Sequence, residues 1–98
     1  MSETQTFTAQ AQRAHHQILA AIHHWRLAHD CGPSTRDLLR ETDVTSTSMV
    51  AMYLEQLREL GLVAWSERYY DERGGMERVR GSLNLTESGR MQIGADHE

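Results

Sequence analysis

Two stretches decide the fold of this 98-residue chain: Gly32-Pro33-Ser34-Thr35-Arg36-Asp37-Leu38-Leu39 and Val44-Thr45-Ser46-Thr47-Ser48-Met49-Val50. Each contains hydroxyl residues suited to capping a helix, followed by apolar residues suited to a core. Asp43 stands between them, at a turn position where aspartate tolerates unusual backbone angles. Gly61-Leu62-Val63 then ends one helix and starts a strand. The pattern predicts two short helices, a tight turn and a strand, which is the layout of a helix-turn-helix.

The two short helices have predicted bounds and inward faces. Ser34 or Thr35 is expected to cap the first, which runs to about Thr42. Ser46 is expected to cap the second, which ends at Gly61. The residues expected to face the core are Leu38 and Leu39, then Val44 in the turn, then Val50, Leu54, Leu57 and Leu60.

A longer helix precedes this pair. Thr8 is a good cap for it, and Gly32-Pro33 is expected to end it. Apolar residues recur in it at steps of three and four, which predicts a single buried face. That face consists of Ala11, Ala14, Ile18, Ala21, Ile22, Trp25 and Ala28.

Strand patterns follow the helices. Apolar and polar residues alternate from Val63 to Tyr70, and Met76 to Leu85 returns as a second strand after a glycine-containing turn. Thr86 is expected to cap a short last helix. The predicted class is mainly α with a small β-hairpin (α+β). A single domain is expected, with a flexible tail (1–6), a first helix (7–31), the helix-turn-helix (34–61), a hairpin (62–85) and a short helix with a tail (86–98).

Composition excludes several classes of protein. No apolar run approaches the roughly 20 residues that span a bilayer, and the N-terminus lacks the pattern of a secretion signal. A single cysteine excludes an internal disulfide, so a cytoplasmic protein is expected. Cys31 is interpreted as a buried or half-buried core residue in preference to a reactive thiol. No enzyme motif is present, and no enzymatic activity is expected.

The sequence also resembles a known family of DNA-binding domains. Its similarity to the N-terminal domain of LexA-type repressors is carried by Phe7-Thr8, Pro33-Ser34, Thr45-Ser46-Thr47-Ser48, Leu54, Leu57 and Gly61-Leu62-Val63. The hairpin and the ending Leu85-Thr86-Glu87-Ser88-Gly89-Arg90 look more like MarR- or PadR-type regulators. The resemblance implies a winged helix-turn-helix, with a three-helix core, a two-stranded wing and a short C-terminal helix.

Three departures limit what the resemblance implies. The expected first helix is longer than the family's by about one turn. Thr42 and Asp43 stand where the family usually has leucine and glycine. LexA-type repressors also carry a serine peptidase domain, which this sequence does not contain, so self-cleavage is not expected.

The resemblance implies a set of DNA-contacting residues. In such domains the N-terminal end of the recognition helix reads base edges, and the preceding helix touches phosphates. The residues at these positions are Thr45, Ser46, Thr47, Ser48 and Met49, then Met52 and Tyr53 one turn further, with Thr35 and Arg36 on the preceding helix. The alternative is that Ser46 only caps the helix and that Met49 or Met52 packs in the core.

Arginines on the hairpin are a further candidate contact. Arg68, Arg73, Arg78 and Arg80 are expected to contact phosphates, and the tip residue Arg73 is also a candidate for a minor groove. The alternative is that the hairpin arginines, which include Arg80, pair with Glu67, Asp71, Glu72 and Glu77. Equal numbers of both charges mean that the hairpin is not a basic patch by count.

The chain carries a formal net charge of −4, which is unusual for a nucleic-acid binder. We therefore expect a monomer to bind double-stranded DNA weakly, and a homodimer to double the contacts on a palindromic site. Trp25, Leu27 and Met91 exceed what a small core needs and are candidates for the dimer surface. The expected function is a sequence-specific transcriptional regulator, a repressor; the alternative is a module that binds a regulator or polymerase instead of DNA.

Histidines crowd the first helix, at His15, His16, His23, His24 and His29. Zinc needs such ligands to converge, but no cysteine or carboxylate completes a set and adjacent histidines point to different faces. A solvated or dimer-facing helix is expected, with no metal and no cofactor.

Overall fold

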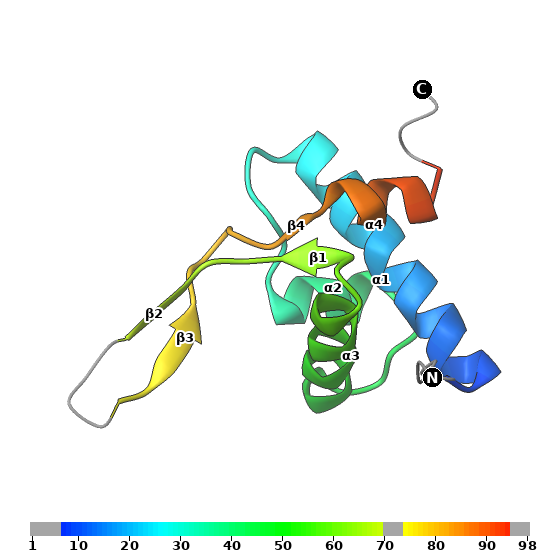
Figure 1. Cartoon of the computed structure of the whole chain (residues 1–98), viewed down its shortest axis with the longest axis horizontal. Helices are drawn as coiled ribbons and strands as arrows, with labels where there is room; N and C mark the ends of the chain where they lie inside the picture. The colour runs from blue at the N-terminus through cyan, green and yellow to red at the C-terminus, as the bar shows by residue number, and fades with distance from the viewer. Residues whose placement is uncertain (1–6, 70–73, 95–98) are drawn as a thin grey trace, which may run out of the picture.

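A computed structural model describes residues 7–69 and 74–94 of the chain. Within these residues the elements run in the order α1 (Ala9–Ala28), α2 (Thr35–Glu41), α3 (Thr47–Glu59), β1 (Val63–Ala64), β2 (Glu67–Tyr69), β3 (Met76–Arg78), β4 (Asn84–Leu85) and α4 (Glu87–Gln92). The helices gather at one end, and β2 and β3 project away from them (Figure 1). The predicted α+β class is confirmed at this level.

Each described helix begins at a hydroxyl side chain that accepts a hydrogen bond from a backbone N–H in the first turn. The caps are Thr8, Ser34, Ser46 and Thr86, at oxygen–nitrogen distances of 3.0 to 3.2 Å. Three of these caps were predicted outright, and Ser34 is the cap among the two candidates for α2. Such caps stabilise a helix by about 1 kcal/mol because they satisfy a backbone donor that has no partner inside the helix.

The C-terminal end of α3 is closed by a glycine in the left-handed conformation. Gly61 has φ +78°, its N–H donates to the carbonyl of Arg58 at 3.0 Å, and Leu62 N–H donates to the carbonyl of Leu57 at 2.9 Å. This pair of bonds is a Schellman motif. It turns the chain directly from α3 into β1, as the sequence predicts.

The first helix ends earlier than predicted. Helix α1 stops at Ala28, and residues 29–33 form a loop whose Gly32 N–H donates to the carbonyl of Gly81 at 2.9 Å. Cys31 therefore lies in this loop and is exposed, and Ala28, the last residue of α1, is exposed as well. The predictions of a buried Ala28 and of a buried or half-buried Cys31 are therefore wrong.

A single cluster of apolar side chains forms the core between α1, α2, α3 and the β1–β4 pair. Its members are Ala14, Ile18, Leu19, Ala21, Ile22, Leu38, Val50, Tyr53, Leu54, Leu57, Val63, Leu83 and Leu85. Leu39, Val44, Trp65 and Leu62 pack against it and are half-buried. The prediction that Leu60 faces the core is wrong: it is 43% exposed, because the chain reverses at Gly61 and Leu62 packs against the core instead.

The strands form two separate antiparallel pairs. Val63 pairs with Leu85 in β1–β4, and Glu67 pairs with Arg78 in β2–β3. A turn over residues 79–82 interrupts the predicted return strand, with Ser82 N–H donating to the carbonyl of Val79 at 3.1 Å. The continuous strands expected from the alternation are therefore broken, because the returning chain loops out at this turn.

Candidate functional site

The outward face of α3 is exposed along its N-terminal half. Its exposed residues are Thr47, Ser48, Ala51, Met52 and Glu55. The opposite face, Val50, Tyr53, Leu54 and Leu57, is buried. No described segment covers the start of α3, since Thr47 and Ser48 are exposed in the presence of the hairpin. This surface combines two hydroxyls, a thioether and the carboxylate of Glu55, which pairs with Arg58 at 3.0 Å.

The structure divides the residues predicted on α3 into two groups. Thr45, Thr47, Ser48 and Met52 lie at the surface, with Met52 45% exposed. Ser46 is half-buried and its hydroxyl is occupied by the cap. Met49 is half-buried against the core, as the alternative interpretation predicts.

Tyr53 is only 5% exposed, so its predicted place on the contact face is wrong. It follows Met49 by four residues, which places both on the side of α3 that packs inward. The signal available in the sequence was the period set by Val50, Leu54 and Leu57.

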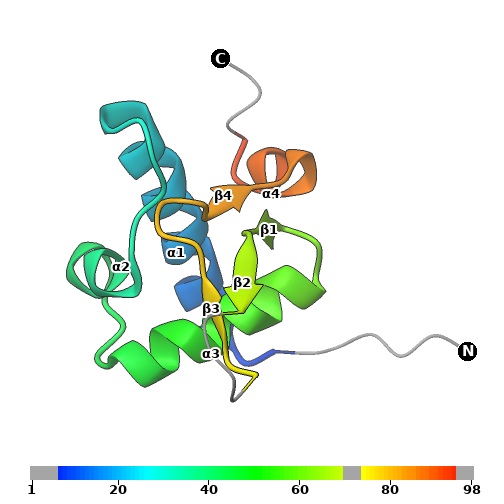
Figure 2. The same cartoon turned by 90° about the vertical axis from the view of Figure 1, so that its left-hand side faces the viewer.

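A groove beside the start of α3 gathers arginines from two distant parts of the chain. It has a volume of ≈ 940 Å³, and its lining residues come from the segment around α2, the start of α3 and the base of the hairpin. Figure 2 shows how α2, α3 and the hairpin are arranged. Its lining includes Arg36, Arg40, Arg78 and Arg80, together with Thr35 and Thr47. Asp37 is the one carboxylate among the described residues that line it. The groove is therefore locally cationic in a chain of net charge −4.

The arginines of this groove differ in their hydrogen bonds, ion pairs and exposure. Arg36 is exposed and makes no hydrogen bond or ion pair with another residue of 7–69 or 74–94. Arg40 pairs with Asp37 at 2.6 Å and keeps a side chain that is 66% exposed. Arg78 is half-buried, and its Nη2 donates to the Thr35 hydroxyl at 2.8 Å. Thr35 and Arg78 thus join α2 to β3.

Arg78 lies over the ring of Trp65, together with Arg58. Its guanidinium lies 5.4 Å from the centre of the Trp65 ring, and that of Arg58 lies 4.3 Å from the same ring. Burial lowers the pKa of Arg78, and the nearby carboxylate of Glu55 opposes that shift. An arginine nevertheless stays charged at neutral pH. The arrangement ties the base of the hairpin to α3 as well as to α2.

Glu67 completes the connection between the hairpin and α3. Its carboxylate accepts hydrogen bonds from Trp65 Nε1 at 3.0 Å and from Arg58 at 3.1 Å. The Trp65 hydrogen bond, and then that from Arg58, lower the pKa of Glu67.

The two other predicted hairpin arginines have different outcomes. Arg68 pairs with Glu77 across the strands at 3.0 Å, which is the surface pairing that the sequence leaves as the alternative. Because side chains alternate between faces, this pair lies on the face opposite Glu67 and Arg78. Arg73, with Asp71 and Glu72, lies outside the described residues.

Replacement of Asp37 by asparagine tests the start of α2. Asp37 Oδ2 accepts a hydrogen bond from Ser34 N–H at 2.9 Å, and this bond is the largest cause that lowers the pKa of Asp37 below 3.8. Burial, the next largest effect, opposes the shift, while the Ser34 hydroxyl and the charge of Arg40 add to it. A depressed pKa contributes stability that is present above pH 3.8 and lost as the pH falls through the folded-state value. We expect Asp37→Asn to lower the free energy of unfolding by about 1 kcal/mol at neutral pH.

The deficit is expected to shrink as the pH falls below 3.8, measured by urea unfolding at several pH values. Glu41→Gln removes an exposed carboxylate of the same helix and serves as the control, with an effect within about 0.5 kcal/mol. A deficit of the same size at pH 7 and pH 2.5 would contradict the role assigned to the Asp37 charge.

The histidines of α1 do not converge on a metal site. His15 is buried, and its Nε2 lies 2.7 Å from Gln56 Oε1, so the prediction of a solvated or dimer-facing position is wrong for this residue. His16, His24 and His29 are exposed. Among residues 7–69 and 74–94, no group of three metal-ligating side chains comes together.

Apolar side chains remain exposed away from the groove. Leu27 is 73% exposed and Met91 62%, whereas Trp25 is half-buried and stacks on His29 with ring centres 4.2 Å apart. In the described part of the chain no helix has the length and apolar character required to cross a bilayer.

No protein-family model, no curated protein and no solved structure matches the chain.

Proposed function

We propose that this protein is a winged helix-turn-helix transcriptional regulator that binds double-stranded DNA. In this proposal α3 is the recognition helix, α2 precedes it, and β2–β3 form the wing. The observation that carries the proposal is the arginine-lined groove directly beside the exposed start of α3. A helix end open to solvent next to a local cluster of cations suits a duplex, in which base edges lie beside phosphates.

The outward face of α3 supports reading of bases by small groups. The hydroxyls of Thr47 and Ser48 can donate to or accept from base edges, and the Met52 methyl group can contact a thymine methyl. This face has no forked arginine and no amide among its exposed positions 47, 48, 51, 52 and 55. We therefore expect sequence preference to depend in part on DNA shape.

The groove would supply the phosphate contacts. Arg36, Arg40 and Arg80 are exposed on it, whereas Arg78 is committed to Thr35 and orients the hairpin. Three exposed cations per protomer are few, because each phosphate contact contributes about 0.9 to the salt exponent of binding. A homodimer acting as a repressor on a palindromic site would double them, with the exposed Leu27 and Met91 as candidates for the protein–protein contact.

The test is a binding titration by fluorescence anisotropy over a series of salt concentrations. A duplex selected from a random library serves as the specific ligand, and a scrambled duplex as the non-specific one. We expect Arg36→Gln with Arg80→Gln to weaken binding to both duplexes and to lower the salt exponent by about 2 per protomer. We expect Ser48→Ala with Met52→Ala to weaken binding to the selected duplex about tenfold and to leave the scrambled one unchanged.

Arg68→Gln is the matched control, since Arg68 is ion-paired on the opposite face of the hairpin. The affinity of the Arg68→Gln variant for both duplexes should equal that of the unmodified protein. Absence of binding to any duplex at low salt would overturn the proposal. It would favour a protein-interaction module that uses the exposed Met52 side chain.

A further inference from the structure

We propose that Glu55 is a specificity-determining residue whose carboxylate accepts a hydrogen bond from the amino group of a cytosine in the major groove. The inference rests on the proposed function and deepens it, because it names a base that the duplex must present. Glu55 is the one carboxylate among the exposed positions 47, 48, 51, 52 and 55 on the outward face of α3.

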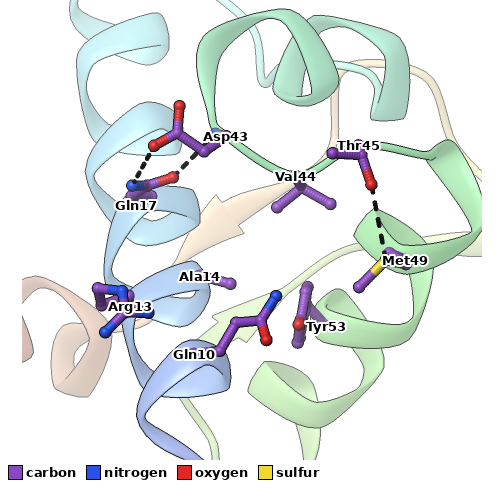
Figure 3. A pocket seen from close by; sticks show the side chains of 9 residues that line it. All are labelled: Gln10, Arg13, Ala14, Gln17, Asp43, Val44, Thr45, Met49 and Tyr53. Carbon is purple, nitrogen blue, oxygen red and sulfur yellow. Dashed lines mark hydrogen bonds between the residues drawn. The ribbon is translucent and has the colours of Figure 1, made fainter.

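Glu55 continues a row of exposed side chains along α3. Residues three or four positions apart stand above one another on a helix, so Ser48, Met52 and Glu55 lie in line. The opposite side of the helix is closed to a partner, because Met49 and Tyr53 are turned toward α1 (Figure 3). A duplex that contacts Ser48 and Met52 therefore meets Glu55 next.

Arg58 orients the Glu55 carboxylate. Its Nη2 donates to Glu55 Oε1 at 3.0 Å, its Nη1 donates to Glu67 at 3.1 Å, and its guanidinium lies over the Trp65 ring. The other oxygen, Glu55 Oε2, accepts no hydrogen bond from a residue of 7–69 or 74–94, and the Glu55 side chain is 55% exposed. The carboxylate is therefore held through one oxygen and keeps the other as an open acceptor. An exposed pair of this kind adds little to stability, so pairing with Arg58 alone does not account for a carboxylate on this face.

Glu55 also lies close to the arginine groove. Burial lowers the pKa of Arg78, and the charge of Glu55 is near enough to oppose that shift. Arg78 lines the groove together with Thr47, at the start of α3. A duplex that places its phosphates in the groove and its base edges on the start of α3 therefore also covers Glu55. A carboxylate at such a place repels phosphates, so it weakens binding of every duplex that offers it no donor.

The base edges of the major groove offer a carboxylate few donors. Guanine presents the acceptors N7 and O6, and thymine presents the acceptor O4 with a methyl group. Adenine presents the N6 amino group beside the acceptor N7, whereas cytosine presents the N4 amino group and no acceptor. An ionised carboxylate only accepts hydrogen bonds, so it is repelled by guanine and thymine and in part by adenine. Cytosine is therefore the base that suits Glu55.

The helix also predicts where this cytosine lies. Positions 48 and 55 are about 10 Å apart along the axis of α3, at a rise of about 1.5 Å per residue. Successive base pairs of B-DNA are about 3.4 Å apart. With α3 lying along the major groove, we expect the cytosine about three base pairs from the position whose preference changes in Ser48→Ala.

The experiment selects duplexes from a random library with the full chain and with two variants of Glu55, and then measures affinities by fluorescence anisotropy. The unmodified protein should select cytosine at one position, and guanine there should weaken binding at least about tenfold. Glu55→Gln should select adenine at that position alone, because an amide matches adenine N6 and N7. Glu55→Ala should lose the preference there and bind a scrambled duplex about twofold more tightly, since a charge that repels phosphates is removed.

A change in the DNA separates contact with the base from a role in the helix. Replacing the selected cytosine by 2-pyrimidinone removes only the N4 amino group. This should weaken binding of the unmodified protein about tenfold and that of Glu55→Ala not at all, a coupling that a purely structural pair with Arg58 would not show. Glu59→Ala removes an exposed carboxylate one turn further along α3 and is the matched control, which should keep the preference for cytosine.

The outcomes distinguish this inference from the proposed function. If no duplex binds at low salt, the proposed function fails and the role of Glu55 fails with it. If duplexes bind, but the unmodified protein and Glu55→Ala select the same bases, the role of Glu55 fails alone. Equal weakening of both proteins by 2-pyrimidinone would likewise overturn only the contact between Glu55 and the cytosine.

Discussion

Replacement of Gly32 by alanine is expected to lower the free energy of unfolding by about 3 kcal/mol, at the upper end of the range for an added methyl group in a packed site. A Cβ at Gly32 would lie 2.0 Å from the carbonyl oxygen of Leu83, and 2.9 and 3.0 Å from its carbonyl carbon and nitrogen. These are backbone atoms, so no rotamer change relieves the overlap. The loop after α1 would have to move away from the segment that precedes β4.

The Gly32→Ala substitution should also destabilise the base of the hairpin. Gly32 N–H donates to the carbonyl of Gly81, and Arg26 donates to the same carbonyl at 3.3 Å and to that of Leu83 at 2.9 Å. Displacing the loop weakens this set of bonds, which joins α1 to the base of the hairpin. Urea unfolding followed by circular dichroism measures the effect.

The neighbouring substitution Cys31→Ala is the control. Cys31 is exposed, so its replacement should change the free energy of unfolding by less than about 0.5 kcal/mol. If Gly32→Ala were as stable as Cys31→Ala, the close approach of the loop to Leu83 would be wrong.

Replacement of Trp65 by alanine is expected to destabilise the hairpin by about 2 kcal/mol. The change removes contacts with the guanidinium groups of Arg58 and Arg78, each worth about 0.5–1 kcal/mol, together with apolar contact area. It also removes the hydrogen bond from Trp65 Nε1 to Glu67, which is the largest cause of the lowered pKa of that carboxyl. We therefore expect the pKa of Glu67 to rise in this variant.

Hydrogen exchange locates the effect. The amide of Val79, which donates to the carbonyl of Ser66 at 2.8 Å, should exchange about 30-fold faster, while amides inside α1 and α3 change little. Tyr69→Ala is the matched control, because Tyr69 is an aromatic residue of β2 that is 71% exposed. Equal exchange of Val79 in both variants would show that Trp65 does not anchor the hairpin.

Local features of the fold were predictable from short stretches of sequence. The caps Thr8, Ser46 and Thr86 and the glycine that ends α3 depend on hydrogen bonds between residues a few positions apart. The helical period likewise predicted the buried Ile18, Ile22, Leu54 and Leu57. The prediction failed at the helix ends: Ala28 is the last residue of α1 and Leu60 the first after α3, and both are exposed because the chain turns away from the core there.

The candidate sites depend on contacts between distant residues. Arg78 reaches Thr35 across 43 positions, and His15 reaches Gln56 across 41. Sequence spacing could assign Arg36 and Arg78 to a helix and a hairpin. It could not place them in one groove, or show that Arg68 pairs with Glu77 while Arg78 joins α2.

The helices, their caps and their inward stripes follow from the chain alone, because backbone hydrogen bonds and side-chain period act within a few residues. The arginine groove and the burial of Tyr53 exist only once α1, α2, α3 and the hairpin pack together. Packing brings together groups that are separated by tens of residues. The apolar pattern that drives packing does not specify how the charged side chains are placed relative to one another, because burial of apolar surface is non-directional.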